Sequence, residues 1–124
     1  MKPLKIIHQD PLFVVLEKES GLLSIPGRGP DKQDCVSARL RSIFPECIEQ
    51  PSVHRLDMDT SGLMVYALTP GAHRNLSIQF QGREVKKKYV SILDGDVLED
   101  SGEIKLPLRL DIYNRPVQVY DPVH

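Results

Sequence analysis

Two short runs of β-prone residues open the chain, at Lys5–Gln9, where two isoleucines lie among polar residues, and at Leu12–Leu16, which is wholly apolar. Pro11 lies between them, where it favours a turn, so the pattern predicts an antiparallel pair of strands. Glycine and proline then punctuate residues 17–30 too densely for a helix. We expect a long loop there.

Two later segments have the spacing of amphipathic helices. From Cys35 to Phe44 the apolar residues form one stripe, with Asp34 as the expected N-cap and Pro45 as the stop. A second helix is predicted to begin after Thr69, with proline in its first turn, and to end at Gly82. Its apolar positions repeat every four residues, at Ala72, Leu76 and Phe80.

The segment Leu63–Leu68 is apolar at alternate positions on both sides, which predicts a central strand buried on both faces. The other predicted strands are Ser52–His54, Lys87–Leu93, Glu103–Leu106 and a hairpin formed by Leu108–Ile112 and Val117–Tyr120. This order of elements predicts an α+β fold, with helices packed on a mixed, largely antiparallel sheet.

The composition is that of a globular protein, 40% hydrophobic and 27% charged. At 124 residues the chain is long enough for one domain and too short for two ordinary ones. It has no membrane-spanning run and no signal-peptide core, so we expect a cytoplasmic protein without a membrane partner. Cys35 and Cys47 lack the spacing of metal ligands and are expected to be reduced packing residues.

The net charge of −1 excludes a general polycation. One local cluster, Arg83–Lys88, holds four basic residues and one acidic residue. Such a cluster can bind phosphates, although a solvated strand end would have the same composition.

The densest group of ionisable side chains is His54, Arg55, Asp57 and Asp59, directly before the sequence Thr60-Ser61-Gly62. Three interpretations are open: a metal site, a reactive carboxylate held ionised by the arginine, and a structural turn capped by an aspartate. The residues alone do not decide which aspartate would react. No nucleophile elbow and no phosphate-binding glycine loop occurs in the chain.

The nine residues His54–Gly62 resemble the His-Arg-Leu-Asp-x-x-Thr-Ser-Gly signature of the RluA family of pseudouridine synthases. Gly21–Arg28 is similar to the loop after the family's second strand, and Lys87–Val90 to its Lys-x-Tyr motif. Leu106–Leu108 and Asn114–Pro116 resemble the RluA branch, whose members modify large-subunit rRNA and tRNA anticodon arms.

The resemblance implies a role for each matching residue. Asp57 would be the catalytic aspartate, and Arg55 would fill the gap that a flipped uridine leaves in the RNA. Tyr89 would pack against the target base and take part in proton abstraction; its alternative is a core aromatic. A base must leave the helix before its glycosidic bond can be reached, and an aromatic ring stabilises it outside. Further RNA contacts are expected from His54, Arg28, Lys86, Lys87 and Lys88, and a loop-structuring role from Thr60, Ser61 and Gly62.

The reaction breaks the N1–C1′ bond of uridine and rejoins the base through C5. Because this is an isomerisation, the resemblance implies no cofactor and no metal. The implied partner is RNA, either rRNA or a tRNA anticodon stem–loop, and the full-length protein is expected to be a monomer. Residues 1–124 would form a single catalytic domain, incomplete at its C-terminus and without a separate N-terminal RNA-binding domain.

Two departures from the family pattern stand out. The family's Asn-Lys-Pro is Glu17-Lys18-Glu19 here, and the later motifs that supply a basic partner for the catalytic aspartate do not occur. An inactive, truncated RNA-binding fragment is therefore an alternative function, and an unrelated Asp-dependent hydrolase is another.

Overall fold

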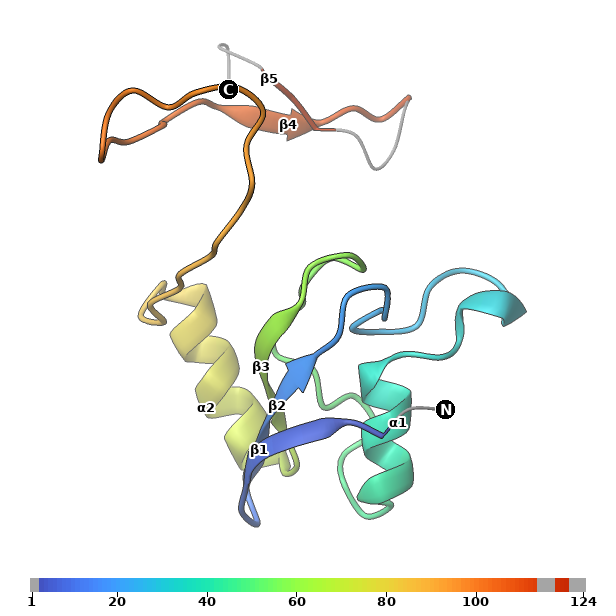
Figure 1. Cartoon of the computed structure of the whole chain (residues 1–124). Helices are drawn as coiled ribbons and strands as arrows, with labels where there is room; N and C mark the ends of the chain where they lie inside the picture. Colours follow the sequence, from blue (N-terminus) through green and yellow to red (C-terminus); the bar gives the residue numbers. More distant parts are fainter. Residues whose placement is uncertain (1–2, 114–117, 121–124) are drawn as a thin grey trace. The chain divides into compact units, whose positions relative to one another are not determined.

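The computed structural model describes residues 3–113 and 118–120, which divide into two compact units, Met1–Lys88 and Tyr89–His124. The first unit contains a three-stranded antiparallel sheet in the order β1-β2-β3 (Figure 1). Its strands are β1 (Lys5–Gln9), β2 (Phe13–Lys18) and β3 (Gly62–Ala67). The predicted antiparallel pair of β1 and β2 is confirmed, as is the α+β class.

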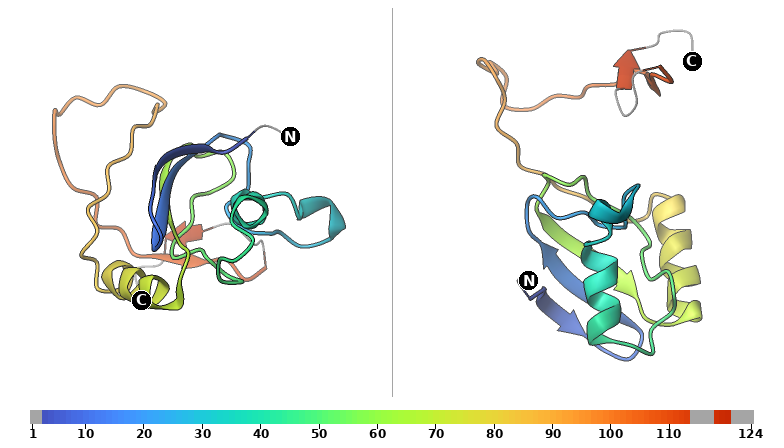
Figure 2. Two further views of the ribbon diagram at one scale, coloured as in Figure 1. Left: turned by 90° about the horizontal axis from the view of Figure 1, so that it is seen from below. Right: turned by 90° about the vertical axis from the view of Figure 1, so that its right-hand side faces the viewer.

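Two α-helices and one 3₁₀ turn complete this unit: α1 (Val36–Ile43), α2 (Pro70–Gln81) and η1 (Pro30–Lys32). Figure 2 shows both helices next to the sheet in two further views. The predicted limits of α2 are confirmed, since the Thr69 hydroxyl accepts a hydrogen bond from the Ala72 N–H and Gly82 is the C-cap.

The predicted cap of α1 is wrong by one residue. Cys35 is the N-cap, and its Sγ accepts the Ala38 N–H at 3.4 Å. The carboxylate of Asp34 binds the guanidinium of Arg39 instead. A carboxylate forms a stronger hydrogen bond with a guanidinium than with a backbone amide, and this pairing leaves the cap to the next side chain.

The core forms where alternate residues of β2 and β3 meet α1. Its members are Val14, Leu16, Leu22, Val36, Leu40, Met64 and Tyr66. The helix contributes one stripe and the strands contribute one face, as their periodicities of 3.6 and 2 require. This core packs β3, which directly follows the charged loop, against β2 and α1.

The prediction that Leu63–Leu68 is a central strand, buried on both faces, is wrong. The central strand is β2, and β3 pairs with it along one edge. On its other edge β3 meets only an isolated bridge between Ser52 and Tyr66, which replaces the predicted strand at 52–54. Leu63 is 65% exposed, whereas Met64 and Tyr66 are buried. The alternation of apolar residues along the sequence does not show which strands pair with one another. The pairing of strands determines which edge and which face of a strand are covered.

The second unit contains a two-stranded antiparallel sheet of β4 (Leu108–Leu110) and β5 (Gln118–Tyr120). The predicted pairing of these strands is confirmed, although Asn114–Pro116 and Val117 lie outside the described residues. The strands predicted at 87–93 and 103–106 do not form. Val90 and Ile92 are fully exposed there. A strand needs a partner edge as well as β-prone residues, and these residues have no such partner among those that the structure describes. Within the described residues, no helix is long and apolar enough to cross a membrane.

Candidate functional site

The charged residues 54–60 form a loop at the end of the first unit where β2 and α2 finish and β3 begins (Figure 1). The Thr60 N–H donates to the carbonyl of Asp57 at 3.1 Å, which closes a turn. The side chains of Arg55, Asp57 and Asp59 are exposed around this turn. Gly62, at φ +142°, connects the loop to β3 in a conformation that side-chain-bearing residues rarely adopt. The loop therefore presents its carboxylates to solvent on a fixed backbone.

The residues that follow β2 fasten this loop to the core. The Gly21 N–H donates to the carbonyl of Met58 at 2.8 Å, and the Ser20 hydroxyl donates to the carbonyl of Asp59 at 2.8 Å. Both acceptors belong to the turn that carries Asp57. The loop is thus held by hydrogen bonds to its backbone carbonyls, and these hydrogen bonds do not use its ionisable side chains.

Ser24 makes a second attachment, on the other side of Asp57. Its buried hydroxyl donates to the carbonyl of Leu56 at 2.7 Å and accepts the Leu56 N–H at 3.0 Å. The Tyr66 hydroxyl donates to the carbonyl of Ser24 at 2.9 Å. Burial raises the pKa of this phenol, so Tyr66 remains a neutral donor. The residue before Asp57 is therefore fixed through both of its backbone polar groups.

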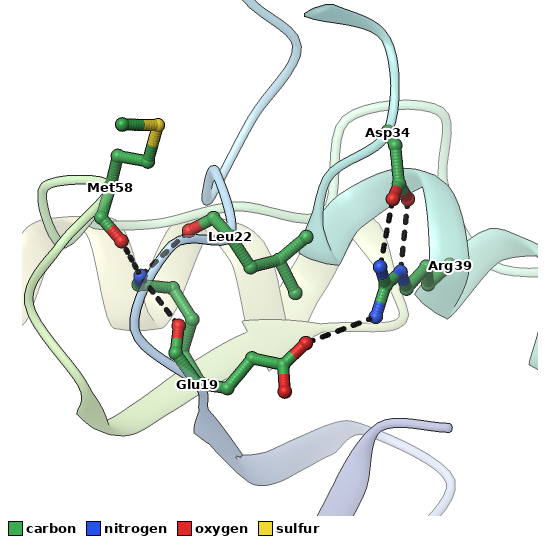
Figure 3. A network of polar contacts seen from close by, with 6 residues as sticks. Glu19, Leu22, Asp34, Arg39 and Met58 are labelled. Carbon is green, nitrogen blue, oxygen red and sulfur yellow. Dashed lines mark hydrogen bonds and ion pairs between the residues drawn. The ribbon is translucent and has the colours of Figure 1, made fainter. Parts of the chain in front are cut away.

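Lys18 is a fully buried lysine beneath the loop. Its Nζ donates to the carbonyls of Leu22 at 2.6 Å, Met58 at 2.8 Å and Glu19 at 3.1 Å, as drawn in Figure 3. An ammonium has three donors, and all three are used. Burial lowers the pKa of Lys18, while the charges of Asp59 and Asp57 oppose this shift. The buried ammonium thus lies within electrostatic reach of both carboxylates of the loop.

His54 connects the loop to β3 and α2. Its Nε2 accepts the Val65 N–H at 3.1 Å, which places the proton of the neutral ring on Nδ1. The ring stacks on Phe80, in the last turn of α2, with centroids 4.4 Å apart. The Nζ of Lys87 lies 5.5 Å from the centroid of the Phe80 ring. Burial and the charge of Lys87 lower the pKa of His54, so the ring stays neutral at physiological pH. The hydrogen bond from Val65 ties His54 to β3, and the RNA contact expected of His54 stays a prediction.

A polar bridge braces the other side of the same segment. The guanidinium of Arg39 binds the carboxylate of Asp34 through two nitrogens, at 2.9 and 2.7 Å, and lies 3.7 Å from the carboxylate of Glu19 (Figure 3). The role of Arg39 is structural, because it joins Asp34 at the start of α1 to Glu19, the residue after Lys18. The departure Glu17-Lys18-Glu19 from the family pattern therefore has a structural use in this chain.

The remaining site residues lie in three places. Arg28 is exposed on a separate loop, which the Gly27 N–H closes by donating to the carbonyl of Lys32. Lys86, Lys87 and Lys88 are exposed after α2, in the first unit. Tyr89 begins the second unit and is 65% exposed, so the alternative of a core aromatic on a strand is wrong. Among the described residues, no group of three His, Cys, Asp or Glu side chains could hold a metal ion.

Sequence reasoning did not assign roles to the residues that fasten the loop, namely Lys18, Ser20, Gly21 and Ser24. A signal was present, because Lys18, Gly21 and Ser24 lie in the two stretches compared with the family's loop motifs, and Ser20 lies between those stretches. Their function could not be read from spacing, since Lys18 and Met58 are 40 residues apart in the sequence and Ser24 and Leu56 are 32 apart.

Residues 12–122 match the family model described as RNA pseudouridylate synthase. The chain belongs to the RNA pseudouridylate synthase family. This match covers both units and includes the whole loop 54–60. The resemblance seen in the nine residues of the loop thus extends over most of the sequence.

Curated relatives in this family are similar along nearly the whole chain. A protein of Yersinia pestis named dual-specificity RNA pseudouridine synthase RluA is 48% identical over 113 residues, which are 91% of this chain and 53% of that protein. Its namesake from Escherichia coli (strain K12) is 46% identical over 93% of this chain and 51% of its own length. The chain therefore spans about half the length of these relatives.

A solved structure has a similar fold. The structure titled human RNA pseudouridylate synthase domain containing 4 superposes with a TM-score of 0.51 at 27% sequence identity. The superposition covers 64% of this chain and 30% of that one. The fold and the sequence family agree.

Proposed function

We propose that this protein is an RNA pseudouridine synthase in which Asp57 is the catalytic residue. The observation that carries this proposal is the anchored loop. An exposed carboxylate lies between two backbone attachments, Ser24 to Leu56 and Lys18 to Met58, inside a family member's signature. Catalysis requires a reacting group that is both accessible and fixed, and this loop provides both.

The chemistry assigns distinct tasks to the exposed groups. The target uridine leaves the RNA helix, its N1–C1′ bond breaks beside Asp57, and the base rejoins the ribose through C5. The guanidinium of Arg55, two residues before Asp57, stacks in the vacancy and pairs with phosphate. Tyr89 packs on the extruded base and assists removal of the C5 proton. The buried ammonium of Lys18 holds the backbone of the loop through the Met58 carbonyl, next to Asp57.

RNA binding rests on local charge, because the chain as a whole carries a net charge of −1. Lys86, Lys87 and Lys88 are exposed in a row and Arg28 is exposed on its own loop, which suits contact with phosphates. The proposed substrate is RNA, either rRNA or a tRNA anticodon stem–loop or both, as the family resemblance implies; the relatives are named dual-specificity RNA pseudouridine synthases. We expect a monomeric, cytoplasmic enzyme that needs neither cofactor nor metal.

The test compares two neighbouring aspartates. Release of tritium from RNA containing 5-tritiated uridine should fall by at least about 10³-fold in Asp57→Asn. The matched control Asp59→Asn changes the same charge in the same exposed turn and should retain most of the activity. An undiminished rate in Asp57→Asn would remove the catalytic assignment, and a loss confined to Asp59→Asn would move it to that residue.

A second candidate function is RNA binding without catalysis, which is suggested by the chain spanning about half the length of its relatives. The intact mass of the natural protein, measured together with RNA binding and tritium release, separates the two. A natural product of 124 residues that binds RNA and releases no tritium would favour the binding function.

A further inference from the structure

Arg83, just beyond α2, has a backbone conformation that arginine rarely adopts. Its φ is +55°, and it is the only non-glycine residue with positive φ among those that the structure describes. This left-handed region brings Cβ too close to the following carbonyl oxygen, so every residue except glycine is disfavoured there.

The end of α2 explains why the left-handed conformation is needed. The N–H groups of Gly82, Arg83 and Glu84 donate to the carbonyls of Ile78, Phe80 and Gln79 at 2.8, 3.1 and 2.9 Å. Such a reversal needs a residue with positive φ after the helix, and glycine is its usual occupant. Here the glycine stands one position earlier, at φ −78°, where an added Cβ would lie 3.2 Å from the Ile78 carbonyl. The close approach of the Ile78 carbonyl thus explains why residue 82 is glycine. The reversal explains the positive φ of residue 83, but it does not explain why that residue is arginine.

Arg83 is linked to the anchored loop through Phe80. Its N–H binds the carbonyl of Phe80, and the Phe80 ring stacks on His54 at 4.4 Å. Within the described residues, no salt bridge or side-chain hydrogen bond engages its exposed guanidinium. The three exposed lysines 86–88 follow closely in the chain. Arg83 is therefore a further exposed cation of the segment 83–88, which follows α2.

We infer that Arg83 is an RNA-phosphate-binding residue, and that its exposed positive charge explains why arginine and not glycine occupies the strained position at the end of α2. This inference rests on the proposed function. An arginine fixed at φ +55° trades folding stability for a phosphate contact, and strained conformations of this kind concentrate at functional sites. The contact is to the RNA backbone, so it strengthens binding without reading a base.

The test uses three substitutions and two readouts. Arg83→Gly and Arg83→Asn both remove the charge and place a residue that tolerates positive φ at this position. Because the backbone strain falls, Tm should rise by about 2–5 °C. The Kd for a labelled tRNA anticodon stem–loop should increase by about 3- to 10-fold, and the slope of log Kd against log salt should fall by about 0.7–0.9. Arg83→Lys keeps the charge and the strain, and should change both readouts least.

The matched control is Arg74→Asn, which removes an equal charge from an exposed position near the opposite end of α2. It should leave RNA affinity within about twofold of the original protein. If Arg83→Gly raises Tm but binds the stem–loop as the original protein does, the side chain has no role at the RNA and the inference is wrong. An original protein that forms pseudouridine while Arg74→Asn and Arg83→Asn weaken binding equally would also overturn it. Absence of all RNA binding by the original protein would overturn the proposed function and this inference together.

Discussion

Lys18 shows how one buried charge can organise a loop. Taking an ammonium out of water is costly unless every N–H finds an acceptor. Three carbonyls, from Glu19, Leu22 and Met58, supply those acceptors. Two of them lie next to Lys18 in the sequence and the third lies in the charged loop. The side chain therefore stabilises the loop backbone at Met58, the residue after Asp57.

Lys18→Met tests this function because methionine has a similar volume and no donors. It leaves the three carbonyls short of a buried partner, so we predict a loss of about 2–4 kcal/mol in the free energy of unfolding. Chemical denaturation measures the loss. Lys5→Met is the matched control, since the Lys5–Glu17 pair at 3.0 Å is exposed and should contribute less than about 0.5 kcal/mol. Equal effects of the two substitutions would contradict the role of Lys18.

His54 is held in its neutral form, because Nε2 must accept the Val65 N–H. Its folded pKa lies below the ordinary value of 6.5. Between those two values the unfolded chain binds more protons than the folded one. The stability that His54 contributes is therefore fully present above pH 6.5 and is lost as the pH falls through the folded pKa.

We predict that the free energy of unfolding of the original protein declines as the pH falls below 6.5, and that His54→Gln flattens this decline. Denaturation at a series of pH values measures both curves. His8→Gln serves as the control, because the His8 ring is at the surface beside Asp10 and should leave the decline in place. A decline that survives unchanged in His54→Gln would assign it to other groups.

At the scale of elements, the two helices are capped by different chemistry. Thr69 caps α2 with a hydroxyl, and Cys35 caps α1 with a thiol, which is a weaker acceptor. Helix α1 compensates through burial, since Val36 and Leu40 belong to the core. Helix α2 has no fully buried residue, so its stability depends more on its ends and on the contact between Phe80 and His54.

Thr69→Ala should therefore cost about 1 kcal/mol and lower Tm by about 3–6 °C, because the Ala72 N–H loses its partner. Thermal unfolding followed by circular dichroism measures the shift. Thr69→Ser retains the hydroxyl and should stay close to the original Tm. A serine variant as unstable as the alanine variant would show that the methyl group, and not the cap, is responsible.

At the scale of the whole molecule, the chain divides at Lys88 into the sheet–helix unit and the β4–β5 unit. Residues 85–107 between α2 and β4 form neither helix nor strand. This boundary falls between the basic segment that is proposed to contact RNA, at Lys86–Lys88, and Tyr89. The 54–60 loop, by contrast, lies wholly within the first unit.

Limited digestion with trypsin should therefore cut first after Lys86, Lys87 or Lys88 and leave a product that contains β1 to α2. Proteases act on exposed, extended backbone, and these three lysines lie in such a segment. Arg28 is the internal comparison, because it is exposed but lies in a loop closed by Gly27–Lys32 and Gln33 hydrogen bonds. Mass spectrometry of the early products decides, and a first cut at Arg28 would contradict the prediction.

The sequence alone determined the local features of this protein. Helix α2, the β1–β2 pair and the nine-residue loop followed from caps, turns and a motif, because each is encoded by residues close together in the chain. It also pointed to the family and to Asp57 through the resemblance. The strands expected at 87–93 and 103–106 failed for the opposite reason, since β-prone residues do not specify a partner.

Only the tertiary structure decided how the site is held. The contacts of Lys18 with Met58, of Ser24 with Leu56 and of Tyr66 with Ser24 join residues 32 to 42 positions apart. No periodicity records such pairs, because they form when β2, β3 and α1 pack together. The edge position of β3 and the left-handed backbone of Arg83 were likewise set by packing and by the reversal of the chain after α2. The sequence thus identified the 54–60 loop as the candidate site, and the fold determined which residues hold its backbone.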